Sequence, residues 1–390
     1  MTSPTRRIGL SKSRLTAFEQ CPKRLWLQVH RPDEAELDDG AELRFATGDQ
    51  VGDAACAMYP HGVMIEAEPN LAAALDRTRE LLAADHPGPL FEATFEFEGV
   101  LVRVDVMERA GDGWHIAEVK SSTRAKDYHL ADLATQIWVL QNCGISVQSA
   151  AIRHVDREFV LLREGELEGL FSDHHCLEDI AGLIARRADI VAKARSCLDG
   201  EEPDLETGAH CSSPFECEFA AYCSRGKPAG PDWPVSLLPR GAGRIWQERG
   251  IDDLLALNEA DLGGLNARIL AATRSGTPYH DLKGANAAIE KWSWPRAWLD
   301  FETIAFAVPR WIGTRPYSQV PFQFSLHLEA EDRTMTHSGF LSTDGGDPRR
   351  ACAAALIEQI PVDATIIAYN AGFERTVLRD LAAACPALAQ

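Results

Sequence analysis

The chain has 390 residues and a formal net charge of −19, and 45% of its residues are hydrophobic. This length exceeds what one hydrophobic core ordinarily organises, so we expect two domains with enough apolar residues to fold. No apolar run approaches the roughly 20 residues that span a membrane, and the first residues lack the apolar core of a signal peptide. We therefore expect no membrane span, and a reducing cytoplasm as the location of this cysteine-containing chain.

The acidic balance argues against nucleic acid as a partner, but the charges are unevenly distributed. Residues 1–31 contain seven Lys and Arg against one acidic residue, Glu19. Two interpretations are open: a basic N-terminal segment that follows a phosphate backbone, or a solvated basic face.

In chain order, the residue pattern predicts alternating helices and strands. Helical spacing predicts a helix over residues 13–30, capped by Ser11 or Ser13, and a second helix over 70–85. Further elements are expected as strands at 91–98, 100–108 and 114–120, a helix over 128–143, strands near 147–155 and 157–162, and a long helix over 166–198.

Asp105, Glu118 and Lys120 lie on the strands 100–108 and 114–120, which the turn Gly111-Asp112-Gly113 joins into a hairpin. Residues two apart share a strand face, so Glu118 and Lys120 project together, and Asp105 can face them. Two carboxylates can hold Mg²⁺ or Mn²⁺, and an ammonium group can orient water and neutralise phosphate charge. Solvated strand ends are the alternative; Gln136, inside the apolar face of the next helix, favours a site.

Cys211, Cys217 and Cys223 follow one another at equal gaps in a loop rich in Ser, Pro and Glu, and Cys21 is a fourth candidate far upstream. Structural zinc usually takes ligand pairs with two to four intervening residues, so this spacing fits an iron–sulfur cluster better. Buried, inert cysteines are the alternative interpretation.

A segment rich in Pro and Gly, residues 226–234, is the expected linker. Residues 236–292 contain short apolar stretches that predict a connector of small helices, to which no catalytic role is assigned. The expected parts are thus residues 1–225, 226–295 and 296–390.

Asp300 and Glu302 lie two apart on the expected strand 297–303 and so share a face. An apolar strand at 365–369 is followed by Asn370 and a helix that carries Glu374. Carboxylates so placed can gather two divalent ions for hydrolysis at a 3′ end.

Residues 8–225 resemble the PD-(D/E)XK nucleases of the RecB type, in the branch with a four-cysteine iron–sulfur cluster that includes the CRISPR-adaptation exonucleases and AddB. The shared pattern is Leu-Ser-Lys-Ser-Arg-Leu, Cys-Pro-Lys-Arg-Leu-Trp, Phe-Glu-Ala-Thr-Phe, Arg-Val-Asp, Glu-Val-Lys, a helix with a glutamine, and the cysteine triplet. The resemblance implies that Asp105 and Glu118 are metal ligands, that Lys120 is the catalytic lysine and that Gln136 is the motif glutamine. It also implies a further acidic residue at Glu92. The implied 4Fe–4S ligands are Cys21, Cys211, Cys217 and Cys223.

Two positions depart from this family pattern. The tyrosine expected four residues after the motif glutamine is Leu140, and the histidine of an early Gly-x-x-x-His helix is absent after Gly48, where Gly52 stands. The first departure bears on DNA-backbone contact, and the second on the affinity or number of metal ions.

Residues 296–390 resemble the DnaQ-like (DEDD) exonuclease fold, an RNase H-like fold, as found in an uncharacterised domain that often follows this type of nuclease domain. Asp300 and Glu302 match its first motif, and Glu374 stands where an Asp is usual. The last motif of that fold has no counterpart after Glu374, so we expect a partial domain without a working two-ion site.

Together these features predict an α/β protein with a restriction-endonuclease-like core, an iron–sulfur loop and a partial RNase H-like domain. The expected activity is divalent-metal-dependent hydrolysis of DNA, on single strands or ends, as an exonuclease rather than an endonuclease, in DNA repair or mobile-element defence. A non-catalytic nucleic-acid-binding scaffold and a zinc or redox protein are the alternatives.

Overall fold

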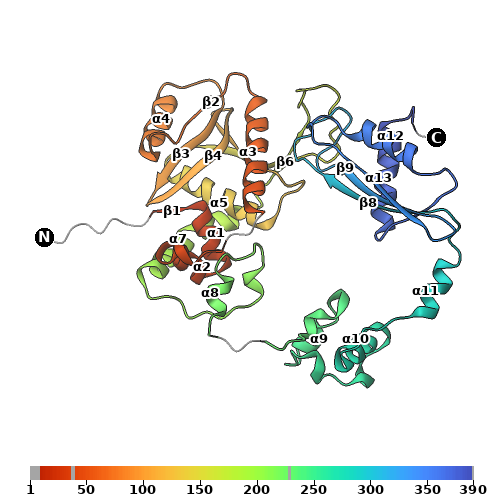
Figure 1. The fold of residues 1–390 in the computed structure, drawn as a ribbon. Helices are drawn as coiled ribbons and strands as arrows, with labels where there is room; N and C mark the ends of the chain where they lie inside the picture. The colour runs from red at the N-terminus through yellow and green to blue at the C-terminus, as the bar shows by residue number, and fades with distance from the viewer. Residues whose placement is uncertain (1–8, 37–39, 227–229, 389–390) are drawn as a thin grey trace.

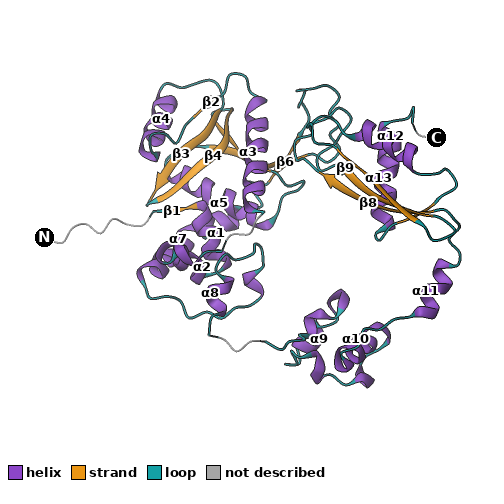
Figure 2. Cartoon of the chain, viewed as in Figure 1, coloured by secondary structure: helices purple, strands orange, loops and turns teal. Residues whose placement is uncertain are grey.

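The computed structural model describes residues 9–36, 40–226 and 230–388, and combines helices with two mixed β-sheets (Figure 1, Figure 2). The expected α/β class is therefore confirmed. Among these residues, no helix is both long enough and apolar enough to cross a membrane. Arg6 and Arg7 of the basic N-terminal segment, and residues 227–229 of the expected linker, lie outside the described residues.

The N-terminal sheet has seven strands in the order β2-β3-β4-β5-β6-β7, with β1 paired to β4. Its strands are β1 (Leu10–Ser11), β2 (Val63–Met64), β3 (Leu90–Phe97), β4 (Val100–Ala110), β5 (Gly113–Lys120), β6 (Val147–Val155) and β7 (Phe171–His175). Strands β3, β4 and β5 are antiparallel neighbours, whereas β5 and β6 are parallel and are connected through helix α5 (Asp127–Asn142). Parallel neighbours require such a crossover, which holds α5 against the sheet.

Helices surround this sheet. They are α1 (Lys12–Gln20), α2 (Pro22–His30), α3 (Ala41–Ala57), α4 (Leu71–Ala83), α6 (Ala181–Ala185), α7 (Arg187–Asp199) and α8 (Ala220–Ser224), with 3₁₀ turns η1 (Pro32–Glu34) and η2 (Ala209–Cys211). Val102 and Val104 of β4 are buried in one apolar cluster with Leu133 and Ile137 of α5. This apolar stripe of α5 fixes which way its polar Gln136 can point.

The helix expected over 13–30 is wrong in one respect, because the chain forms two helices that meet at Cys21. Pro22 occupies the first turn of α2, and Cys21 is extended, with φ −162° and ψ 115°. Proline disfavours the helical conformation of the residue before it, so α1 ends at Gln20. The break leaves the Cys21 side chain at a corner between two helices.

Two further expectations are wrong between residues 157 and 198. The segment 157–162 is not a strand, and the segment 166–198 contains β7 before α6 and α7. Asp173 of β7 forms an ion pair with the buried Arg153 of β6, at 2.8 Å. A polar edge strand of this kind carries little apolar periodicity from which it could be predicted.

The middle part, as described from residue 230, forms small helices around its own apolar cluster. These are η3 (Val235–Leu237), η4 (Pro239–Gly241), α9 (Arg244–Gln247), η5 (Leu254–Ala256), η6 (Glu259–Asp261), α10 (Gly264–Ser275) and α11 (Leu282–Ile289). Val235, Leu254 and Leu270 are buried in this cluster, and the small helices expected over residues 236–292 are present.

The C-terminal sheet has the order β10-β9-β8-β11, in which only β11 and β8 are parallel. Its elements are β8 (Arg296–Ile304), β9 (Val320–Glu329), β10 (Met335–Leu341), α12 (Arg349–Gln359), β11 (Thr365–Ile367) and α13 (Ala371–Ala384). Leu299 and Phe301 of β8 are buried in one cluster with Leu356 of α12 and Val377 of α13. Both helices therefore cover the same face of the sheet (Figure 1).

The connection between β8 and β9 contacts the N-terminal sheet. Backbone hydrogen bonds join Gly313 N to Leu161 O at 2.7 Å and Leu161 N to Thr314 O at 3.0 Å. Ala307 is buried in an apolar cluster with Val51 of α3 and Val155 of β6. These contacts, far apart in sequence, hold residues 157–162 in a loop.

Candidate functional site

The hairpin of β4 and β5 places Asp105 beside β5. Pairing runs from Ala110 opposite Gly113 to Val106 opposite Ala117. One residue further on, an Asp105 carboxylate oxygen accepts a hydrogen bond from Val119 N at 2.7 Å. The structure thus brings Asp105 next to the strand segment that carries Glu118 and Lys120.

Glu118 is fully buried and is surrounded by donors. Its Oε1 accepts from Lys120 Nζ at 2.7 Å and from Lys12 Nζ at 2.6 Å. Its Oε2 accepts from the side-chain amide of Gln136, which α5 directs at the strand. A buried carboxylate needs such partners to remain charged.

Two residues that the sequence reasoning missed complete this cluster. Lys12, at the start of α1, is also 3.9 Å from Asp105 Oδ1. Asp132 of α5 is 3.4 Å from Lys120 Nζ and accepts from Thr16 Oγ1 at 2.6 Å. Asp132 lies four residues before Gln136, so helical spacing alone could have placed it on the same face. Lys12 lies in the shared Leu-Ser-Lys-Ser-Arg-Leu pattern, but its spacing does not indicate the contact with Glu118.

The ionisation of the two hairpin carboxylates is unequal. Burial, with the nearby charge of Glu118, raises the pKa of Asp105 to about 7. Burial alone would raise the pKa of Glu118 too, but the adjacent Lys12 and Lys120 outweigh it and leave that pKa below its usual range. Glu118 therefore favours its charged form more strongly than Asp105 does.

A cavity of about 300 Å³ adjoins Asp105, and neither Lys12 nor Lys120 is among the residues that line it. Its walls include Glu92 of β3 and Asp49 and Asp53 of α3, together with Gly52. Glu92 is also in an ion pair with Arg103, at 3.0 Å. Asp49 and Asp53 were not singled out from the sequence, although their spacing of four places both on one helix face. The resembled family has histidine where this chain has Gly52. The charged groups that α3 contributes to the cavity wall are therefore the carboxylates of Asp49 and Asp53.

Leu140, which stands in place of a tyrosine, is fully buried in the core. Its side chain belongs to the apolar cluster between α5 and the sheet, so it contributes packing in this chain.

The four predicted cluster cysteines line one small cavity. Cys21 comes from the α1–α2 corner, Cys211 from η2, and Cys223 from α8, while Cys217 N donates to Cys211 O at 2.8 Å. All four thiols are free. The structure therefore assembles side chains separated by about 190 residues in sequence, and a set of four thiols fits either an iron–sulfur cluster or zinc by its donor chemistry.

Among residues 9–36, 40–226 and 230–388, no three His, Cys, Asp or Glu side chains are placed so that they could hold a metal ion. At the hairpin, ammonium groups occupy the space beside the carboxylates.

The C-terminal carboxylates differ in their surroundings. Asp300 and Glu302 are exposed and alternate with Leu299 and Phe301, so they lie on the sheet face opposite α12 and α13. Glu374 is buried, and its Oε2 has no hydrogen-bond partner among the described residues. Glu374 shares its helix stripe with Val377 and Leu381, which pack onto the covered face.

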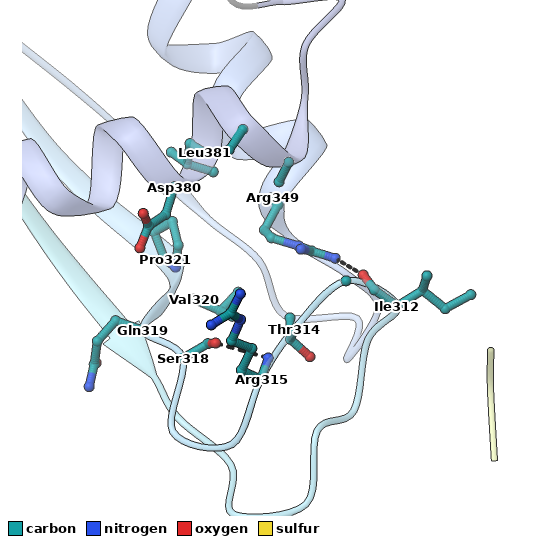
Figure 3. A pocket seen from close by; sticks show the side chains of 13 residues that line it. Ile312, Thr314, Arg315, Ser318, Gln319, Val320, Pro321, Arg349, Asp380 and Leu381 are labelled. Carbon is teal, nitrogen blue, oxygen red and sulfur yellow. Dashed lines mark hydrogen bonds between the residues drawn. The ribbon is translucent and has the colours of Figure 1, made fainter. Parts of the chain in front are cut away.

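A separate cavity of about 610 Å³ lies between the β8–β9 connection and α13 (Figure 3). Arg349 reaches across it to donate to Ile312 O at 2.6 Å, and also pairs with Asp347. Arg315, another wall residue, pairs with Glu158 of the N-terminal part at 3.0 Å. Both arginines thus hold the connection in place, and none of the predicted site residues lines this cavity.

Residues 297–390 match a domain of unknown function, DUF2779. No curated protein matches the chain. Among solved structures, the crystal structure of SSO0001 is similar at 12% identity, covering 57% of this chain and 88% of that chain with a TM-score of 0.25. Likeness at this level assigns neither a fold nor an activity to the chain.

Proposed function

We propose that the chain is a divalent-metal-dependent DNA nuclease with a PD-(D/E)XK core of the RecB type, whose site contains Asp105, Glu118 and Lys120. The observation that carries the proposal is Glu118. This carboxylate is fully buried on a hairpin strand, yet it is held charged by Lys120 two residues away and by Gln136 from the crossover helix. Burying a charged group costs stability. Buried clusters of charged groups are therefore typical of functional sites, where the charge has a chemical role.

Each residue has a defined part in the proposed reaction. A divalent ion held by Asp105 and Glu118 would supply positive charge to the scissile phosphate. Lys120 Nζ, fixed between Glu118 and Asp132, is positioned to orient the attacking water and to neutralise charge that develops on the phosphate. Gln136 keeps Glu118 in one orientation by binding its second oxygen.

The proposed substrate is single-stranded DNA or DNA ends, with exonuclease action, in repair or mobile-element defence. The support is the resemblance of residues 8–225, not the charge of the molecule as a whole.

We further propose that Cys21, Cys211, Cys217 and Cys223 hold a 4Fe–4S cluster. Gln20, next to Cys21, donates to the carbonyls of His210 and Phe215 at 2.7 Å each, so the cysteine loop is already fastened to α1. Ligation by all four thiols would close this junction covalently and tie together the two ends of the N-terminal part.

For residues 296–390 we propose a DnaQ-like fold. The order β10-β9-β8-β11, with β11 parallel to β8, supports it. Asp300 and Glu302 could bind a single ion with water, because two carboxylates are enough for Mg²⁺. One ion stabilises a leaving oxygen less well than two, so this part is proposed to contribute little cleavage.

The test is cleavage by protein purified without oxygen, on single- and double-stranded DNA labelled at either end, with Mn²⁺ and with Mg²⁺. We expect metal-dependent cleavage that is lost in Asp105→Ala, together with weaker metal binding. Metal-dependent binding of DNA without cleavage would favour the scaffold alternative. Turnover in Asp105→Ala equal to that of the unmodified protein would overturn the assignment to this site.

A further inference from the structure

Lys12 forms the closest ion pair of the hairpin site. Its Nζ is 2.6 Å from Glu118 Oε1 and 3.9 Å from Asp105 Oδ1. These are the two carboxylates proposed to hold a divalent ion. A positive group that contacts both of them occupies a cation position.

The other oxygens of these carboxylates are already engaged. Asp105 Oδ2 accepts from Val119 N at 2.7 Å, and Glu118 Oε2 accepts from Gln136. The oxygens left for a shared ion are therefore Asp105 Oδ1 and Glu118 Oε1. Lys12 contacts both of them, whereas Lys120 contacts Glu118 Oε1 alone of the two. An ion that bridges them meets the Lys12 ammonium in the same space and with the same sign of charge.

Lys120 is less suited than Lys12 to be displaced from Glu118 by an ion. It extends from the same strand face as Glu118 and has a second ion pair, with Asp132 at 3.4 Å. Lys12 comes from a different part of the chain, at the junction of β1 and α1. The ion pairs of Lys12 in the described part of the chain go to the two proposed ion ligands alone, and its side chain is partly exposed.

We propose that Lys12 is an internal counter-ion that a divalent metal must displace from between Asp105 and Glu118. The inference rests on the proposed metal site and adds its regulation. Without metal, Lys12 neutralises Glu118 and keeps the site closed to weakly bound cations. Metal affinity is consequently set by an exchange of one cation for another, and is weaker than two carboxylates alone would give.

The test is calorimetric titration of the full chain with Mn²⁺, without DNA, for the unmodified protein and three variants. Lys12→Met removes the charge but keeps the length of the side chain, and should bind Mn²⁺ at least about tenfold more tightly, because a like charge near the ion is gone. Lys12→Arg keeps the charge and should bind no more tightly than the unmodified protein. Lys193→Met is the matched control, since it removes a lysine from an exposed ion pair with Asp189 on α7, and its affinity should not change.

A second measurement needs no variant. Acetylation of lysines in the unmodified protein, read by mass spectrometry, should increase at Lys12 when Mn²⁺ is added and stay constant at Lys193, because displacement frees the Lys12 amine from its ion pair. This result keeps the proposal testable if Lys12→Met fails to fold.

The outcomes separate this inference from the proposed function. If the unmodified protein binds Mn²⁺ and cleaves DNA, but Lys12→Met binds it no more tightly and Lys12 acetylation does not respond, the counter-ion role is overturned and the nuclease proposal stands. The ion then lies elsewhere, for instance in the cavity lined by Asp49, Asp53 and Glu92. If neither the unmodified protein nor Lys12→Met binds Mn²⁺, the metal site and the counter-ion role are both overturned.

Discussion

The surroundings of Glu118 could be predicted in part from the residue pattern of its own strand. Alternation along β5 predicts that Glu118 and Lys120 share a face, and the hairpin turn predicts that Asp105 lies beside them. The helical spacing of α5 predicts an inward Gln136. The contact with Lys12, by contrast, joins residues 106 positions apart and depends on how β1 pairs with β4, which no local pattern encodes.

Gln136 offers a direct test of this local environment. Gln136→Ala leaves Glu118 Oε2 buried without its side-chain donor, so the free energy of unfolding should fall by about 1–3 kcal/mol. Urea unfolding measures this difference. Asn142→Ala, a neighbouring amide on α5 that bonds only to Trp138 O among its described contacts, is the control. An unchanged stability in Gln136→Ala would show that the bond to Glu118 contributes little.

At the scale of elements, periodicity located β3, β4, β5, β6, α4 and α5, because each buries an apolar face of regular spacing. The same signal failed for β7, a polar edge strand held by the Arg153–Asp173 ion pair. It also failed at Pro22, where an apolar pattern continues through a break in the helix. In that case the proline was the better guide, because its conformational restriction is local and strong.

The ion pair between β6 and β7 makes the stability of the sheet depend on pH. Burial alone would raise the pKa of Asp173, but Arg153, with His115, outweighs it and leaves that pKa below its usual range. A lowered folded-state pKa contributes stability above about pH 4 that is lost as the pH falls further. Asp173→Asn should therefore lower the free energy of unfolding by about 2 kcal/mol at pH 7, and less at lower pH. Urea unfolding at pH 7 and pH 3 would contradict this if the difference were the same at both.

The four cysteines that line the cavity at the corner between α1 and α2 should respond alike to substitution. Replacing any one of Cys21, Cys211, Cys217 or Cys223 by Ser should remove the brown colour of protein prepared without oxygen and lower its thermal stability, because the four line one cavity. Cys143→Ser, at an exposed position, should do neither. Zinc in place of iron, found by metal analysis of the unmodified protein, would contradict the cluster and favour a zinc site.

At the scale of the whole molecule, the β8–β9 connection of the C-terminal part contacts the N-terminal part beside the candidate site. Tyr317, from the β8–β9 connection, donates to the carbonyl of Ser121, the residue after Lys120. Ala307 is buried against α3, the helix that carries Asp53. The C-terminal part thus supports two walls of the candidate site, an arrangement that sequence could not predict because its contacts are all long-range.

The support from the C-terminal part is separable from its own carboxylates. Asp300 is exposed on the face of β8 opposite α12 and α13. Asp300→Ala should leave cleavage within about twofold of the unmodified protein, because a site without a second ion contributes little to phosphate hydrolysis. Cleavage rates on end-labelled DNA test this. A large loss with Lys120 intact would show that the second site is active.

The central claim is that Lys120 acts on a phosphodiester held beside Asp105 and Glu118. The most direct measurement is the rate of Mn²⁺-dependent cleavage of end-labelled single-stranded DNA by Lys120→Met, with Mn²⁺ binding and circular dichroism measured on the same preparation. We predict a rate at least about 100-fold lower, with the fold and metal binding retained. A rate equal to that of the unmodified protein would contradict the account.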